Sequence, residues 1–200
     1  MSERPTTQAV VGPVRFSYMS VFKARKPNSD DDAEFSVTLL IPKQPTQQCA
    51  EPVAVGKAIR RTLEAALTAK FGSIPPKWDS PLKDGDKETS TDGVPKHPGY
   101  WYIKAKCGED YPPALVDASK NKVAAGSGWK SGDWGKVFVN AYAYDFKGKR
   151  GAALGLRAVQ FLYVDEGFGS AATSADAFAM ESGDAPDAQE SEEYDVFASE

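Results

Sequence analysis

The stretch Val137–Val164, VFVNAYAYDFKGKRGAALGLRAVQFLYV, indicates the fold more clearly than any other part of this chain. In Val137–Phe146 and in Ala152–Val164, small or apolar residues alternate with a second set of side chains, which is the pattern of strands with one buried face. The segment between them, Lys147–Gly151, is short and basic and contains two glycines. Two alternating segments joined by such a turn predict an antiparallel hairpin.

Three earlier segments carry the same alternation. They are Val14–Phe22, with Phe16 and Tyr18 on one face, Phe35–Ile41, and Tyr100–Cys107. Ala114–Asp117 predicts a short strand at most. Between the second and third of these strands the spacing becomes helical, with an apolar stripe in Pro52–Phe71 made of Val55, Ile59, Leu63, Ala66, Leu67 and Phe71. Gly72 is a suitable helix end.

About five strands with one main helix, and no alternation of strands with helices, predict a mainly β protein. The best match is an OB-fold-like antiparallel barrel with long loops. The longest irregular segment is Ser73–Gly99, which contains five prolines and has Trp78 as its expected anchor. Loops of that length in a small domain are usually functional or mobile.

Charge divides the chain into two parts. Residues 1–164 contain all 24 Lys and Arg, whereas residues 165–200 contain 11 Asp and Glu and no basic residue. Few large apolar residues occur in the second part, so it buries too little surface to offset the entropy of ordering. We therefore predict a barrel domain over 1–164 and a disordered acidic C-terminal tail over 165–200.

Enzymatic and metal-binding classes find little support. The only histidine, His97, lies in the proline-rich loop, and Cys49 and Cys107 are too few for a Cys/His zinc site. Asp117, Asp133 and Asp145 lack any spacing typical of a metal-dependent nuclease. No phosphate-binding loop motif is present. We expect no enzyme activity, no cofactor and no metal. Without an apolar leader or a membrane-length apolar run, we also expect an intracellular protein.

One strand face combines aromatic and basic residues. By alternation, Trp101, Ile103, Ala105 and Cys107 are expected in the core, and Tyr100, Tyr102, Lys104 and Lys106 on the other face. Single-stranded nucleic acid exposes both phosphates and base faces, so a sequence-tolerant binder needs cations beside aromatic platforms. The remaining predicted DNA-binding residues are Arg15, Lys23, Lys43, Tyr142, Tyr144, Phe146, Lys147, Lys149, Arg150 and Arg157. The alternative is that these aromatics are ordinary strand neighbours and that the lysines only maintain solubility.

The acidic tail suggests a regulatory role. A tethered polyanion has a high effective concentration beside a basic groove, so it is expected to occupy the groove until DNA displaces it. The tip Glu190–Glu200, ESEEYDVFASE, combines carboxylates with apolar side chains. Its predicted partner-binding residues, for replication or recombination proteins, are Glu192, Glu193, Tyr194, Asp195, Val196 and Phe197. A purely solubilising tail is the alternative.

Several segments in order resemble a tailed-phage family of OB-fold single-stranded DNA-binding proteins, formerly classed as a domain of unknown function. They are GPVRFSYMSVFKA from Gly12, EFSVTLLIPK from Glu34, KAIRRTLEAAL from Lys57, the turn and strand from Trp129 to Asp145, and KGKRGAALGLRAVQFL from Lys147. The resemblance implies a sequence-nonspecific single-strand binder in phage DNA replication, recombination or repair, acting in the host bacterial cytoplasm. It leaves the oligomeric state open. The alternative is a non-enzymatic phage interaction or structural module that uses the acidic tail to bind a partner.

Overall fold

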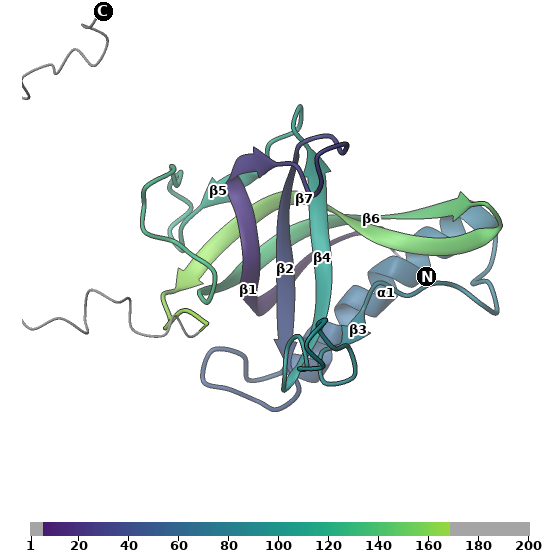
Figure 1. The fold of residues 1–200 in the computed structure, drawn as a ribbon, viewed down its shortest axis with the longest axis horizontal. Coiled ribbons are helices and arrows are strands. Elements are labelled where there is room, and N and C mark those ends of the chain that lie inside the picture. The colour runs from purple at the N-terminus through teal and green to yellow at the C-terminus, as the bar shows by residue number, and fades with distance from the viewer. Residues whose placement is uncertain (1–5, 169–200) are drawn as a thin grey trace, which may run out of the picture. The chain divides into compact units, whose positions relative to one another are not determined.

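The computed structural model describes residues 6–168 (Figure 1). The predicted tail lies almost entirely outside these residues, so its flexibility and the roles of Glu192, Glu193, Tyr194, Asp195, Val196 and Phe197 stay predictions. The elements in chain order are β1 (Gln8–Arg25), β2 (Glu34–Pro42), α1 (Pro52–Phe71), β3 (Lys83–Asp84), β4 (Tyr100–Gly108), β5 (Ala114–Val116), β6 (Trp134–Phe146) and β7 (Lys149–Tyr163). The predicted helix has the observed bounds, and the main strands are all present, most of them longer than predicted.

Five strands close into a barrel in the order β4, β2, β1, β6 and β7. Four of the strand pairs are antiparallel, and β4 closes on β7 in parallel register, with Ala105 opposite Leu154. A closed ring with an odd number of strands cannot alternate direction throughout, so one parallel pair is unavoidable. The predicted OB-fold-like barrel with one main helix is confirmed, and it is antiparallel except at this seam. The short strands β3 and β5 add to β4 and β7 at the ends of the strand order.

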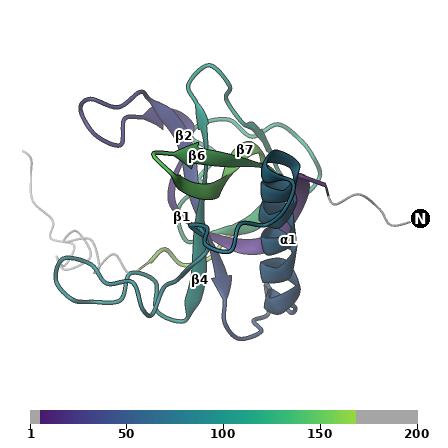
Figure 2. The same ribbon diagram turned by 90° about the vertical axis from the view of Figure 1, so that its right-hand side faces the viewer.

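The helix α1 lies along the barrel and packs against β1, β2, β6 and β7 (Figure 2). Its stripe, including Ile59, Leu63 and Leu67, joins the barrel interior in one apolar core. The helix ends at Gly72, which adopts φ 77° and donates its N–H to the carbonyl of Thr68. Glycine adopts this left-handed conformation without the steric cost of a side chain. Within residues 6–168, no helix combines the length and the apolar character needed to span a membrane.

A β-bulge reverses the face of one tyrosine. Alternation from Phe16 predicts that Tyr18 is on the buried side of β1, but the register to β2 shifts between Ser17 and Ser20. Tyr18 takes φ 45° and is 72% exposed, whereas Phe16 is fully buried. An extra residue in a strand turns the following side chains to the other face. The predicted orientation of Tyr18 is therefore wrong.

The β6–β7 hairpin projects beyond the barrel (Figure 1). Its turn is shorter than predicted, because only Lys147 and Gly148 separate the strands, and both have positive φ. Two-residue turns of this kind match the twist of the strands that they join. The hairpin is attached to the end of α1, since Lys70 Nζ donates to the carbonyl of Ala143 at 3.2 Å.

The long segment between α1 and β4 is held at several points. Trp78 packs against the core, as the sequence predicts, and β3 pairs with β4. Lys43, at the end of β2, binds the carboxylates of Asp84 and Asp86. The excursion therefore covers one end of the β2–β4 surface as an ordered element.

Candidate nucleic-acid interface

The predicted strip on β4 has the expected alternation over most of its length. Ile103 and Ala105 are buried, while Lys104 and Lys106 are about half exposed. Trp101 is the exception, because it is 41% exposed although the pattern predicts a core position. It lies near the start of β4, where the inward side of the strand opens onto a groove beside α1. That expectation for Trp101 is wrong.

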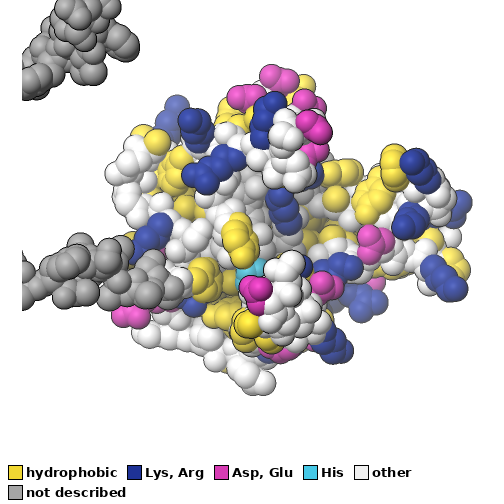
Figure 3. All heavy atoms as spheres, in the orientation of Figure 1, with side chains coloured by type: hydrophobic (Ala, Val, Ile, Leu, Met, Phe, Trp, Pro, Cys, Tyr) yellow, Lys and Arg dark blue, Asp and Glu magenta, His cyan; other side chains and the backbone are white. Residues whose placement is uncertain are grey.

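An aromatic cluster of Tyr18, His97 and Tyr102 lies on the outer face of β1 and β4. The His97 ring is 4.9 Å from Tyr102 and 5.9 Å from Tyr18, measured between centroids, both edge to face. Figure 3 shows the only histidine, in cyan, beside exposed hydrophobic side chains. Burial and the charge of Lys96 lower the pKa of His97, which favours the neutral imidazole. The histidine therefore supports two tyrosine rings and adds no charge.

A buried carboxylate organises the two lysines of the strip. Glu34, at the start of β2, accepts hydrogen bonds from Lys104 Nζ at 2.6 Å and from Lys106 Nζ at 2.7 Å, one on each carboxylate oxygen. Burial alone would raise the pKa of Glu34, but the two lysines lower it overall. The same hydrogen bond raises the pKa of Lys106. Each ammonium group uses one donor on Glu34 and retains others for an anion.

Two grooves meet at Glu34, and together we call them the outer path. The first has a volume of about 370 Å³ and the second about 420 Å³. The first is lined by Tyr18, Ser20, Arg25, Lys26, Pro27, Glu34, Ser36, Thr38 and Lys104. The second is lined by Asp32, Ala33, Glu34, Lys106, Cys107, Gly108, Tyr111, Asn140, Tyr142, Gly155, Leu156 and Arg157. Aromatic rings thus stand at both ends, with the two lysines between them.

The barrel seam explains how Lys106 comes close to Tyr142. Lys106 is opposite Gly155 in the β4–β7 pair, and Gly155 is opposite Asn140 in the β6–β7 pair. Gly155 has no side chain and forms part of the groove floor. Arg157 is exposed on β7 and lines the same groove. Residues predicted separately from three strands therefore line one surface.

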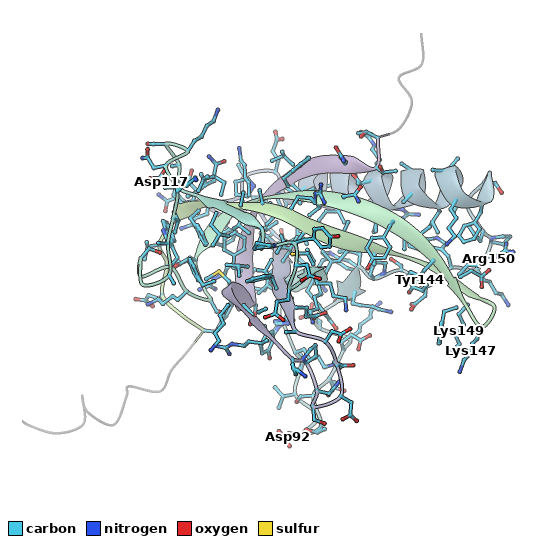
Figure 4. All side chains as sticks on the ribbon, turned by 90° about the horizontal axis from the view of Figure 1, so that it is seen from above. Asp92, Asp117, Tyr144, Lys147, Lys149 and Arg150 are labelled. Carbon is cyan, nitrogen blue, oxygen red and sulfur yellow. The ribbon has the colours of Figure 1, made fainter. Side chains whose placement is uncertain are left out.

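The hairpin carries the remaining predicted residues away from this surface. Figure 4 shows Lys147 and Lys149 at its tip, with Tyr144 nearer the barrel. Tyr144 leans over Gly151, where an added Cβ would lie 2.4 Å from its hydroxyl oxygen. Arg150 bonds Asp145 at 3.2 Å, and its guanidinium lies 5.0 Å from the ring centroid of Phe71. Arg150 is therefore partly occupied in fastening the hairpin to α1.

Arg15 is covered by the first residues that follow β7. Its Nη2 donates to the carbonyl of Glu166 at 2.6 Å and lies 3.8 Å from the carboxylate of Asp165. Its guanidinium is 4.3 Å from the ring centroid of Phe168. Arg15 also reaches the hydroxyl of Tyr100, at 3.4 Å. Two predicted DNA-binding residues, Arg15 and Tyr100, thus lie together at the point where the acidic segment begins.

Besides the hairpin lysines, two more predicted lysines do not line the outer path. Lys43 binds Asp84 and Asp86 and lies 4.9 Å from the ring centroid of Trp101, beside α1. Lys23 is exposed on β1 but lines neither groove.

The outer path also contains residues that sequence reasoning missed. They are Tyr18, Arg25, Lys26, Glu34, Tyr111 and Asn140. His97, which was also missed, lies beside the path, between Tyr18 and Tyr102. Arg25 and Lys26 belong to the basic motif KARK, so the sequence did contain a signal for these two DNA-binding candidates. The reversal of Tyr18 and the pairing of Glu34 depend on register, which alternation alone does not reveal.

A family model described as "Enterobacter phage Enc34, ssDNA-binding protein" matches residues 7–192. The chain belongs to this family. Among solved structures, the single-stranded DNA-binding protein from bacteriophage Enc34 in complex with ssDNA superposes with a TM-score of 0.66 at 21% identity, covering 82% of this chain and 90% of that one. The same phage protein in another structure gives 0.63 at 21%, with coverages of 86% and 89%.

A second phage protein has a similar fold. The structure of gp2.5, a single-stranded DNA-binding protein encoded by bacteriophage T7, superposes with a TM-score of 0.53 at 18% identity, covering 89% of this chain and 97% of that one. At these identities the superpositions show a shared fold. No curated protein sequence matches the chain.

The family match confirms the resemblance found in the sequence. The superpositions agree with the barrel fold. The family description names a DNA-binding protein, which confirms the expectation that the chain is not an enzyme. The three aspartates considered for a nuclease have separate structural contacts. Asp117 holds the backbone of Asn121, Asp133 accepts from the N–H groups of Lys130 and Asp165, and Asp145 pairs with Arg150.

Proposed function

We propose that this member of the phage ssDNA-binding family binds single-stranded DNA along the outer path, without strong sequence preference. The observation that carries the proposal is the pair Lys104 and Lys106, oriented by Glu34 between aromatic groups. Phosphates would bind the ammonium groups, and bases would stack on Tyr18, Tyr102 and Tyr142. Neither phosphate binding nor stacking selects a particular base.

The position of the outer path agrees with the way OB folds bind oligonucleotides. OB-fold sites lie on the face of the second and third barrel strands and on the loops between strands 1 and 2 and between strands 4 and 5. Here those strands are β2 and β4, and the loops are 26–33 and the hairpin turn. We extend the proposed DNA contacts to the hairpin on this basis, with Tyr144, Lys147, Lys149 and Arg150. Arg157, which lines the outer path, and the pair Arg15 and Tyr100 are also proposed contacts.

Fluorescence anisotropy with labelled oligo-dT and a matched duplex tests the proposal. We expect preference for the single strand, because a duplex does not expose base faces for stacking. On a log–log plot against salt, affinity should fall with a slope of about −0.7 for each phosphate neutralised. Lys122→Ala serves as a control, since this exposed lysine lines neither groove. Equal binding of duplex and single strand, or a flat salt response, would contradict the proposal.

We further propose that residues 165–200 act as a gate on a DNA-binding domain formed by 1–164. The support is the contact of Asp165, Glu166 and Phe168 with Arg15, which puts the first residues of the acidic segment on a proposed DNA-binding residue. A tethered anionic segment competes with DNA at a high local concentration. Displacement by DNA would then free the tip for replication, recombination or repair proteins in the host cytoplasm.

Three chain lengths distinguish the effect of residues 165–168 on DNA binding from that of residues 169–200. A chain that ends at Phe168 keeps the observed Arg15 contacts, and a chain that ends at Val164 loses them. We expect oligo-dT affinity to rise from the full chain to the Phe168 end and again to the Val164 end. Equal affinity for all three would remove the gate and leave the DNA proposal intact.

A further inference from the structure

An apolar groove lies between α1 and the ends of β2 and β4, and we call it the helix groove. Its volume is about 480 Å³, which is within the range of about 300–1,000 Å³ that is usual for small-molecule sites. Trp101, which lines it, and Tyr102 are successive residues of β4, so their side chains leave the strand on opposite faces. The helix groove is thus separate from the outer path.

Two tryptophans from distant parts of the chain line the helix groove. Trp101 comes from β4 and is 41% exposed, and Trp78 comes from the long excursion and is half-buried. The other two tryptophans are occupied elsewhere, because Trp129 stacks on Phe161 and Trp134 is buried. Stacking of bases on aromatic rings accepts every base, since each has a π face. The exposed surfaces of Trp78 and Trp101 are therefore suitable platforms for unpaired bases.

The charged side chains that line the helix groove are basic. They are Lys43, Lys57 and Arg60, and in the part of the chain that the structure describes no carboxylate lines this groove. Within residues 6–168, Lys57 forms no ion pair. Arg60 bonds Glu64 at 2.7 Å, but the arginine side chain is 70% exposed, and such surface pairs exchange partners at little cost. A ligand with flat apolar rings and separate negative charges fits this arrangement.

Lys43 places a cation beside one of the rings. Its ammonium group lies 4.9 Å from the ring centroid of Trp101 and is held there by Asp84 and Asp86. These carboxylates use two of its three donors, which leaves one for a phosphate. The sequence predicts Lys43 as a DNA-binding residue, yet it does not line the outer path. Its position in the helix groove gives that prediction a different site.

A glycine in α1 leaves room for a ring against the helix backbone. Gly56 lies inside the helix and lines the groove. No atom lies within 4 Å of the position that its Cβ would occupy, so packing among the described residues does not require glycine there. Glycine also lowers helix stability relative to alanine. Gly56 and Arg60 are one helical turn apart, so a base placed over the glycine has a cation beside it.

We infer that the helix groove is a second binding site for unpaired nucleotides of single-stranded DNA. Bases stack on Trp78 and Trp101, and phosphates bind Lys57 and Arg60. Paired bases do not expose their faces, so the site excludes duplex DNA. The chain then holds single-stranded DNA on both faces of β4.

The tryptophans allow a direct test in the full chain, and the inference rests on the proposed function for its class of ligand. In a chain labelled with ¹⁵N-tryptophan, four indole signals are expected, assigned by single Trp→Phe replacements. Oligo-dT should shift the signals of Trp78 and Trp101, although no tryptophan lines either part of the outer path. The signal of Trp129, which lies outside all three grooves, should stay in place. A matched duplex should shift neither groove tryptophan.

Gly56→Leu fills the helix groove and leaves the outer path intact. The new side chain starts in open space, and leucine is a better helix former than glycine, so the fold should persist. In this variant oligo-dT should no longer shift the signals of Trp78 and Trp101. Affinity for a long oligo-dT should fall about 10-fold, as expected for the loss of one stacked base. Ala54→Leu, exposed on α1 but outside the helix groove, is the matched control and should bind like the wild type.

Three outcomes would overturn the inference. The first is that oligo-dT binds, as measured by anisotropy, but leaves the signals of Trp78 and Trp101 in place. The second is that it shifts them equally in Gly56→Leu, which would mean that β4 transmits the change from the outer path. The third is that the signals change with protein concentration in the absence of DNA, which would assign the groove to a second copy of this chain.

A variant of the outer path tests the proposed function separately. The chain in which Lys104 and Lys106 are both replaced by Gln should bind oligo-dT more weakly, while saturating oligo-dT still shifts the signals of Trp78 and Trp101. Unchanged affinity in this chain would remove the outer path and leave the helix groove as a DNA site. Weaker binding without any shift would remove only the helix groove.

Discussion

The outer path and the tip of the β6–β7 hairpin contain the same kinds of residue but differ in how those residues are held. Lys104 and Lys106 are oriented by one buried carboxylate, between the aromatic cluster and Tyr142. Lys147, in the two-residue turn, and Lys149, at the start of β7, are exposed at the hairpin tip, where Lys147 contacts the exposed ring of Phe146 (Figure 4). Side chains that are already ordered lose less conformational entropy on binding. Composition therefore identifies candidate DNA-binding residues. The contacts that orient each side chain predict which of these residues contribute most to DNA affinity.

The largest effect is expected from the lysines of the outer path. Replacing both Lys104 and Lys106 by Gln keeps a hydrogen-bond donor near Glu34 but removes two charges. Oligo-dT affinity at low salt should fall about 100-fold, taking about 1.4 kcal/mol for each lost charge-assisted contact. The salt slope should decrease by about 1.4. The matched control replaces both Lys147 and Lys149 by Gln. An equal loss of oligo-dT affinity in this control would show that the orientation of Lys104 and Lys106 by Glu34 does not matter for binding.

Tyr18→Ala should produce the next largest effect. Stacking of one base contributes about 1–3 kcal/mol, so affinity should fall about 30-fold at the middle of that range. The ring is mostly exposed, so the thermal midpoint should change little. Phe146→Ala, which changes a similarly exposed aromatic on the hairpin, is the control, measured by the same anisotropy titration. Loss of affinity in Phe146→Ala alone would move the stacking site to the hairpin.

Glu34→Gln should change the pH dependence of stability. The two lysines lower the pKa of Glu34 in the folded protein. The ionised carboxylate therefore stabilises the fold at pH values above the ordinary glutamate pKa of about 4.3. This contribution is lost as the pH falls from that value through the lower folded-state pKa. The wild-type thermal midpoint should therefore decrease more steeply below about pH 4.3 than that of Glu34→Gln. Parallel curves for the two proteins would show that the pair with the lysines adds no stability.

Lys147→Asn should have the smallest effect. Lys147 has φ 50°, a conformation that asparagine adopts more readily than lysine. The free energy of unfolding should rise by about 0.5 kcal/mol, while oligo-dT affinity changes less than about 2-fold. Chemical denaturation and anisotropy measure the two quantities. A large loss of affinity would show that the hairpin tip ranks with the outer path.

Local patterns were sufficient for most of the secondary structure. The helix from Pro52 to Phe71 ends at Gly72 because an apolar stripe of period 3.6 and a left-handed glycine are both local signals. Alternation identified β4 as a strand with Lys104 and Lys106 on its outer side. It misplaced Trp101 because that residue lies where the barrel core ends, a boundary that a period of two residues does not encode.

The candidate site was only partly predictable for the same reason. Lys106 and Tyr142 each carried a recognisable aromatic or basic signal, but their proximity depends on the parallel seam between β4 and β7. Glu34 showed no signal, since a single carboxylate before an apolar strand is common. His97 was identified as the only histidine, and its position between two tyrosines arises from folding of the proline-rich excursion.

The sequence by itself determined the strands, the helix, the barrel class and the separation of a basic part from an acidic one, because periodicity and charge are properties of neighbouring residues. The tertiary structure alone decided that Tyr18 faces outward, that Glu34 joins Lys104 to Lys106, and that a separate groove opens between Trp78 and Trp101. These features depend on a bulge, on strand register and on barrel closure. Each is selected by the packing of residues far apart in the chain, where a shift of one position moves every side chain to the opposite face.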